Sequence, residues 1–146
     1  MTQETGLHTR PAHTTSATHV GIGVLVAAAA SLLVNTAVVT LAAKGIDATA
    51  ARTGLTVQEY VPTTVLGVLA GTAGWWTVRR TAHHPRAVLR ILVPAVVLAS
   101  FVPDLVVLAN GRTLLNVVAL LLMHLVVATI TVCALVRILP LNDNRD

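Results

Sequence analysis

Long apolar stretches separated by short polar segments make up most of this 146-residue chain. The stretches lack the alternation of apolar and polar residues that is typical of barrel strands, and each is long enough to cross a hydrocarbon core of about 30 Å as a helix. Backbone polar groups inside lipid must be paired within the protein, and a helix pairs them within one segment. The pattern therefore predicts an all-α transmembrane protein with helices at about residues 20–43, 61–78, 87–109 and 114–139.

The connections between these stretches indicate how the helices are arranged. Residues 79–86 and 110–113 are short connections, so the helices that they join must run antiparallel as neighbours. This predicts a four-helix bundle of up-down-up-down topology over residues 20–139. The first connection, residues 44–60, is longer, and we expect a short interfacial helix there.

The two ends of the chain differ from the apolar domain. Residues 1–19 are rich in threonine and poor in large apolar side chains, which predicts a disordered cytoplasmic tail. A cleaved signal peptide is the alternative interpretation, but the apolar run at residues 20–43 is longer than the ~7–15 residues of a signal core. Residues 140–146 are predicted to form a short cytoplasmic tail.

Residues that begin and end helices support these boundaries. Pro62 and Pro85 are expected in first turns, where the missing N–H has no helical partner to lose. The Asn110-Gly111 pair predicts a turn, and Thr113 can cap the last helix. In the third helix Pro94 and Pro103 each remove an N–H, so we expect this helix to kink.

Composition excludes several classes of protein. Hydrophobic residues make up 55% of the chain and charged residues only 11%, whereas soluble domains have about 25% charged residues. The net charge of +4 does not indicate nucleic-acid binding, because the arginines stand at the ends of apolar stretches with one tyrosine and one phenylalanine in the whole chain. The single cysteine, Cys133, excludes an internal disulfide and a Cys-x-x-Cys redox pair.

The distribution of basic residues predicts the orientation in the membrane. One side of the four spans carries seven of them, Arg10, Arg79, Arg80, Arg86, Arg90, Arg137 and Arg145, and the other carries three, Lys44, Arg52 and Arg112. By the positive-inside rule, the protein is a multi-pass cell-membrane protein with both termini in the cytoplasm. The loop at residues 79–90, which includes His83 and His84, could also contact anionic lipid headgroups.

Three glycines lie on one face of the second predicted helix. Gly67, Gly71 and Gly74 are spaced i, i+4 and i+7, and small residues on one face let another helix backbone approach closely in lipid. We expect helix packing within the bundle, with a homodimer seam as the alternative. The opposite face of this helix is expected to contact lipid.

Aromatic and basic residues meet at the end of the same helix. Trp75 and Trp76 lie one turn before Arg79 and Arg80, the depth at which amphipathic rings settle in the headgroup region. These four residues are predicted to be interfacial anchors.

Four polar residues within the spans form a candidate intramembrane cluster: His124, Asn35, Asp104 and Asn116. An ionisable side chain deep in a span is a candidate functional residue. We expect neutral His124 to point into the bundle and to bond Asn35 or a backbone carbonyl, with a proton relay or ligand contact as the alternative. Asp104 is expected not to pair with His124, but to be satisfied by water, Asn116 or Arg112 at the outer rim.

Short motifs in three helices resemble those of a known family. Ala70-Gly71-Thr72-Ala73-Gly74-Trp75, Ser100 followed by Pro103, and Met123-His124-Leu125 are similar to the pattern of an uncharacterised family of small four-span bacterial membrane proteins. The resemblance covers about residues 20–139. It implies a four-helix membrane bundle, and it supplies no activity, ligand or catalytic residue.

These observations favour a non-catalytic membrane protein that acts by association with lipids, with other membrane proteins or with further copies of itself. The alternative is a small oligomeric transporter or channel subunit in which the polar residues line a path. A membrane enzyme is disfavoured, because the sequence lacks the paired cysteines or histidines of redox and haem enzymes and a convincing proteolytic constellation. No cofactor, metal or nucleic-acid partner is expected.

Overall fold

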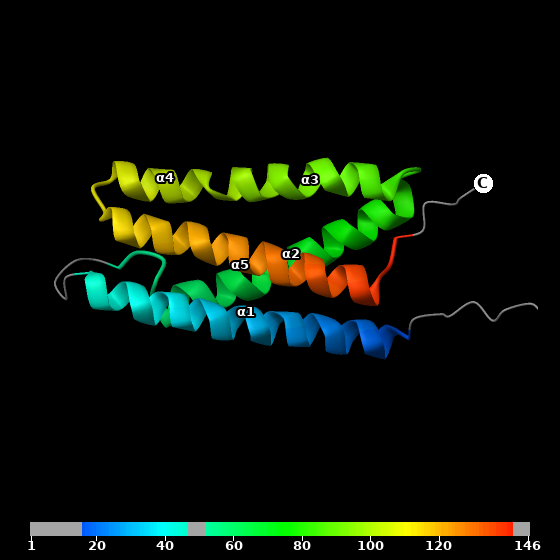
Figure 1. Cartoon of the computed structure of the whole chain (residues 1–146), viewed down its shortest axis with the longest axis horizontal. Coiled ribbons are helices and arrows are strands. Elements are labelled where there is room, and N and C mark those ends of the chain that lie inside the picture. The colour runs from blue at the N-terminus through cyan, green and yellow to red at the C-terminus, as the bar shows by residue number, and fades with distance from the viewer. Residues whose placement is uncertain (1–15, 47–51, 142–146) are drawn as a thin grey trace, which may run out of the picture.

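The computed structural model describes residues 16–46 and 52–141, and these residues are entirely helical apart from their connections. The helices are α1 (Ala17–Gly45), α2 (Val57–Thr81), α3 (Pro85–Ser100), α4 (Val102–Ala109) and α5 (Leu114–Ile138). Figure 1 shows them lying along one long axis, with α3 and α4 as consecutive parts of a single broken rod. The all-helical prediction is confirmed for the described residues.

Helix α1 begins earlier than the apolar pattern predicts. The backbone N–H of Thr18 donates a hydrogen bond of 3.3 Å to the side chain of Ser16, which therefore caps the helix. Residues 17–19, predicted to belong to a disordered tail, are consequently the first turn of α1, and that prediction is wrong for them. The rest of the predicted N-terminal tail lies outside the described residues.

Helix α2 also begins earlier than predicted. One carboxylate oxygen of Glu59 accepts hydrogen bonds from the N–H and the hydroxyl of Thr56, at 3.3 and 2.7 Å, and these bonds fix the start of the helix. Pro62 therefore lies inside the helix and not in its first turn. Residues 57–60 belong to α2 itself, so the expected interfacial helix is absent from the described part of the first connection.

The third predicted span is broken at only one of its two prolines. Helix α3 continues through Pro94, whereas the α-helical hydrogen bonds are interrupted at Phe101, which keeps helical φ and ψ but donates to the Leu98 carbonyl, and α4 follows with Pro103 in its first turn. Pro103 cannot donate to the carbonyl four residues earlier, and its ring crowds that carbonyl. The hydroxyl of Ser100 donates to the Val97 carbonyl at 2.7 Å beside the break.

The connection between α4 and α5 is a tight turn, as predicted. Gly111 has a φ of 80°, a backbone conformation that side chains disfavour, and the side chain of Thr113 accepts a hydrogen bond from the Asn116 N–H. The beginnings of α1 and α3 and the end of α5 lie at one end of the molecule, and this turn lies at the other end (Figure 1).

The core consists of two apolar clusters around α5, separated by smaller and more polar side chains. One cluster includes Tyr60 and Met123 and the other includes Trp75 and Leu135. Between them lie buried residues of mixed polarity on α1, α2 and α5, which are Ser31, Asn35, Thr64, Val68 and Thr131. Helix α1 packs most extensively on α5.

Three helical segments are long and apolar enough to cross a membrane: Ala17–Gly45, Pro85–Ala109 and Leu114–Ile138. Helix α2 has the length of a span, but its threonines, glycines and terminal arginines make it less apolar. The predicted span at residues 61–78 therefore stays a prediction.

Candidate functional site: a groove between α2 and the α3–α4 arm

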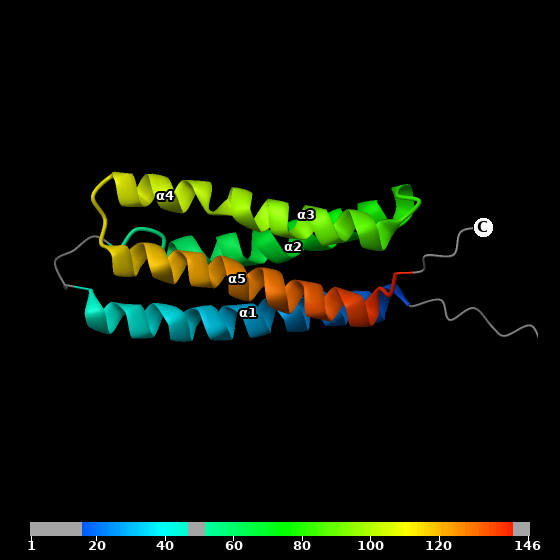
Figure 2. The ribbon, with the colours of Figure 1, turned by 45° about the horizontal axis from the view of Figure 1, so that its top comes forward.

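A cavity of about 610 Å³ runs between α2 and the α3–α4 arm, the segment Pro85–Ala109, and is also lined by α5. It exists because the arm contacts α2 near the connection that joins them and then stands away from it. Pro85 and Leu89 are the only buried residues of α3, and Asp104 is the only buried residue of α4. Figure 2 shows the arm separated from α1 by α5 and α2. We call this cavity the groove.

Small residues of α2 form one wall of the groove. Gly67, Ala70, Gly71 and Gly74 all line it. A Cβ atom on Gly67 would lie 3.3 Å from the side chain of Val127, and one on Gly71 would lie 3.1 Å from Thr131, so α2 and α5 approach closely at these two positions. A Cβ on Gly74 would meet nothing within 4 Å, so the prediction of close packing within the bundle is wrong for Gly74, and the homodimer seam stays a prediction.

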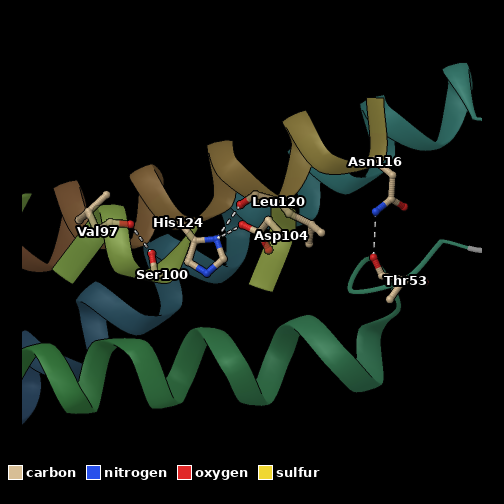
Figure 3. Close-up of polar contacts among 7 residues, drawn as sticks. All are labelled: Thr53, Val97, Ser100, Asp104, Asn116, Leu120 and His124. Carbon is tan, nitrogen blue, oxygen red and sulfur yellow. Dashed lines mark hydrogen bonds and ion pairs between the residues drawn. The ribbon is translucent and has the colours of Figure 1, made fainter. Parts of the chain in front are cut away.

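His124 and Asp104 meet at the wall formed by α4 and α5. The Nδ1 atom of His124 lies 3.1 Å from Asp104 Oδ2 and 2.9 Å from the carbonyl oxygen of Leu120 (Figure 3). A hydrogen bond to the Leu120 carbonyl requires the hydrogen on Nδ1, because a carbonyl oxygen can only accept. The other ring nitrogen is turned away from both oxygens (Figure 3). The ring also makes an edge contact with Phe101, with centroids 6.2 Å apart.

The expectation that Asp104 and His124 do not pair is wrong. It rested on depth, because His124 lies several residues farther from the α4–α5 turn than Asp104 does. Side chains on a helix point toward its N-terminus, however, and α4 and α5 run in opposite directions. Asp104 therefore reaches deeper and His124 reaches back toward the turn, which closes the offset. The predicted hydrogen bond from His124 to a backbone carbonyl is observed.

The two asparagines of the candidate cluster have other partners. Asn35 lines the groove and is fully buried, and its Nδ2 donates to the Thr64 hydroxyl at 2.9 Å. Asn116 is also fully buried, but it donates to the Thr53 carbonyl at 3.0 Å and fastens the first connection to α5 (Figure 3). The candidate cluster is therefore reduced to a pair, His124 and Asp104, with Asn35 on the same groove.

The two tryptophans have different environments. Trp75 is only 4% exposed, and its Nε1 donates to the Leu139 carbonyl at 3.2 Å, so it belongs to the core and the prediction that it is an interfacial anchor is wrong. Trp76 is exposed, and the Arg80 guanidinium stacks 4.0 Å from its ring centroid. For Trp76, Arg79 and Arg80 an anchoring role stays a prediction.

The ionisable side chains that line the groove are two carboxylates and one imidazole. These are Asp104, His124 and Glu59 in the first turn of α2, and no lysine or arginine lines the groove among the described residues. Glu59 precedes the predicted span, and the Thr56 hydroxyl and the N–H groups of Thr56 and Gly54 hold its pKa below the ordinary value. Within the part of the chain that the structure describes, no three His, Cys, Asp or Glu side chains gather as a metal site would require.

Several polar residues that line the groove could not be identified as site residues from the sequence. Thr64, Thr131 and Ser100 line it, and a threonine or serine in an apolar helix usually bonds its own backbone. One spacing does hold information, because His124, Ala128, Thr131 and Leu135 follow each other at helical intervals on the groove face of α5.

The described part of the chain is all-helical, and three of its helical segments are able to cross a membrane. It also holds an ionisable pair inside one groove. These are the features of an integral membrane protein. The sequence profile of a family of unknown function, DUF6069, matches residues 11–140, and the chain belongs to this family. The resemblance to an uncharacterised family is thus confirmed, while four spans and a bacterial origin stay predictions. No curated protein and no solved structure matches the chain.

Proposed function

We propose that the protein is a non-catalytic, multi-pass membrane protein that binds a lipophilic molecule from the bilayer in the groove. The four helical rods would cross the membrane in up-down-up-down order, with both termini in the cytoplasm. The observation that carries the proposal is the groove itself, because its volume of about 610 Å³ is within the range of ligand sites, about 300–1,000 Å³. Its walls are mostly apolar, with a few polar groups that could orient a ligand.

The arrangement of the arm gives a bilayer molecule a route into the groove. Side chains on the arm such as Ile91, Leu98, Val102 and Leu105 are more than half exposed and do not line the groove, so in a membrane this surface would face lipid. Because α3–α4 is held against the rest of the fold at few points, a lipid-soluble molecule could enter beside it without crossing water. This agrees with association with lipids, the function favoured by the sequence.

Photolabelling tests the proposal. The protein in nanodiscs is irradiated with a neutral alkyl diazirine, and the labelled residues are mapped by mass spectrometry. We expect enrichment at groove residues such as Val96 and Val127 over Ile91, which is 75% exposed and does not line the groove. Labelling in proportion to lipid exposure alone would contradict the proposal.

A matched pair of variants sharpens this test. Val96→Trp places a large ring in the groove, whereas Ile91→Trp places the same ring on another face of α3. Labelling of Val127 should fall several-fold in the first variant and remain at the wild-type level in the second. Equal effects of the two variants would show that the label does not occupy the groove.

The contact between His124 and Asp104 favours a second candidate, a small transporter or channel subunit. A buried carboxylate beside an imidazole can exchange a proton, which is a common feature of coupled carriers. Proton-linked flux in proteoliposomes, lost in both Asp104→Asn and His124→Ala, would support a carrier. Binding without flux would leave the first proposal standing.

A further inference from the structure

Two buried side-chain oxygens on the groove make no hydrogen bond among the described residues. They are Oδ2 of Asp104 and Oδ1 of Asn35, and the two residues are only 5% and 0% exposed. The nearest polar neighbour of Asp104 Oδ2 is His124 Nδ1, at 3.1 Å, and this nitrogen also lies 2.9 Å from the Leu120 carbonyl, so its single hydrogen is shared between two oxygens. Buried polar atoms without partners are rare in folded proteins, and both atoms here are acceptors. A ligand that complements these two atoms would offer hydrogen-bond donors.

The charge of the groove restricts the class of ligand further. A carboxylate in an apolar region is costly unless a cation accompanies it. The groove-lining side chains of α1 and α3 are neutral, α2 adds Glu59 and α5 adds His124, so among the described lining residues only a protonated His124 could balance Asp104. With His124 neutral, the lining has net negative charge, which favours a cation over a neutral or anionic ligand.

The apolar walls of the groove indicate what the uncharged part of the ligand should be. Groove side chains beyond the pair include Val93, Val96, Met123 and Val127, which can surround an aliphatic or aromatic body. A bare metal ion is a poor fit, because it requires several oxygen ligands at once and the described residues provide no such group. A protonated amine supplies both the charge and up to three donors on one atom.

We infer that the groove binds a lipophilic amine, with its ammonium group at the carboxylate of Asp104 and its apolar body between α2 and the α3–α4 arm. This inference rests on the proposed function, since it names the class of ligand for the same groove. The ammonium group neutralises Asp104 and gives its Oδ2 a donor that is not shared with the Leu120 carbonyl.

Equilibrium dialysis with two matched probes tests the inference. The protein is held in nanodiscs of a zwitterionic phosphatidylcholine, and binding of radiolabelled dodecylamine and dodecanol is measured after subtraction of binding to empty nanodiscs. Both probes have the same chain, and only the amine carries a charge at neutral pH. We expect the amine to bind about tenfold more tightly than the alcohol, as a charge-assisted hydrogen bond predicts.

Two variants test whether Asp104 is responsible for the preference for the amine over the alcohol. Asp104→Asn keeps the shape of the side chain and removes its charge, so the preference for the amine should disappear while alcohol binding persists. Persisting alcohol binding also shows that the variant is folded. Asn110→Lys, at an exposed position just after α4, changes the net charge by the same amount and should preserve the preference.

Each other outcome has a definite meaning. Equal binding of amine and alcohol by the wild type would overturn the inference and leave the proposed function intact. Binding of neither probe would overturn both. A preference that survives in Asp104→Asn, or that disappears in Asn110→Lys, would show that the cation is not held by Asp104.

Discussion

The contact between His124 and Asp104 joins two otherwise loosely associated parts of the molecule. Asp104 is the only buried residue of α4, so this contact holds the outer half of the arm against α5. Its strength comes from its surroundings, since a polar contact weakens where water competes and the carboxylate side chain is only 7% exposed.

A double-mutant cycle measures this contact. Asp104→Asn and His124→Ala should each lower the free energy of unfolding by about 1–3 kcal/mol, because each leaves a polar partner in an apolar region. Their effects should be coupled by about 1 kcal/mol or more in denaturant titrations in mild detergent. Asp104→Asn combined with Asn116→Ala is the control, since Asn116 bonds Thr53 and not Asp104. Additive effects in both cycles would mean that His124 and Asp104 do not interact.

The glycines of α2 provide a second test at single residues. Gly71→Leu should lower the free energy of unfolding by about 1–3 kcal/mol, because its Cβ would already lie 3.1 Å from Thr131 and the leucine would overpack the contact with α5. Gly74→Leu is the matched control, since open space surrounds that position. Thermal unfolding that is equally affected in both variants would refute the close approach of the helices at Gly71.

Individual helices depend on local interactions at their ends and breaks. Pro94 is tolerated within α3, whereas the helical hydrogen bonds are interrupted at Phe101, two residues before Pro103. The start of α2 depends on the carboxylate of Glu59, which accepts from Thr56 and from the Gly54 N–H at 2.9 Å. Because this carboxylate can be protonated, we expect the stability of the start of α2 to depend on pH.

Glu59→Gln should destabilise the start of α2 by about 0.5–1 kcal/mol at neutral pH, as the loss of a capping interaction does. The pKa of Glu59 is lowered from the ordinary value of 4.5, so its stabilising effect is fully present above pH 4.5 and is lost as the pH falls through the lowered pKa. The difference in unfolding free energy between wild type and variant should therefore shrink below pH 4.5. A constant difference at acid pH would mean that the ionised carboxylate is not the stabilising form.

The molecule as a whole is organised around α5, with α1 and α2 packed closely on it and the α3–α4 arm packed sparsely. The groove is a consequence of this unequal packing. The orientation of the whole protein in a membrane depends instead on charge outside the spans.

Cysteine accessibility tests the orientation. In a Cys133→Ser background, which removes the exposed native thiol, a cysteine at position 50 should react with an impermeant maleimide added outside intact cells. A cysteine replacing His83 should react only after the membrane is opened, because the arginine-rich connection is expected to stay in the cytoplasm. The opposite pattern of labelling would reverse the orientation.

The sequence by itself determined the helices and their approximate extent. Apolar length, turn residues such as Gly111 and the Thr113 cap act within one segment, since helical hydrogen bonds join residues close in the chain. For the same reason the sequence indicated a membrane protein, which depends on the composition of each segment alone. The boundaries of α1 and α2 were missed by a few residues because Ser16 and Glu59 extend the helices beyond their apolar stretches.

Only the tertiary structure decided which residues form the site. The pairing of Asp104 with His124 depends on the directions of side chains on two antiparallel helices, and the burial of Trp75 depends on a carbonyl 64 residues away. The groove depends on where the α3–α4 arm leaves α2, which no single segment encodes. These features arise from the relative tilt and rotation of helices, and those are set by packing between distant parts of the chain.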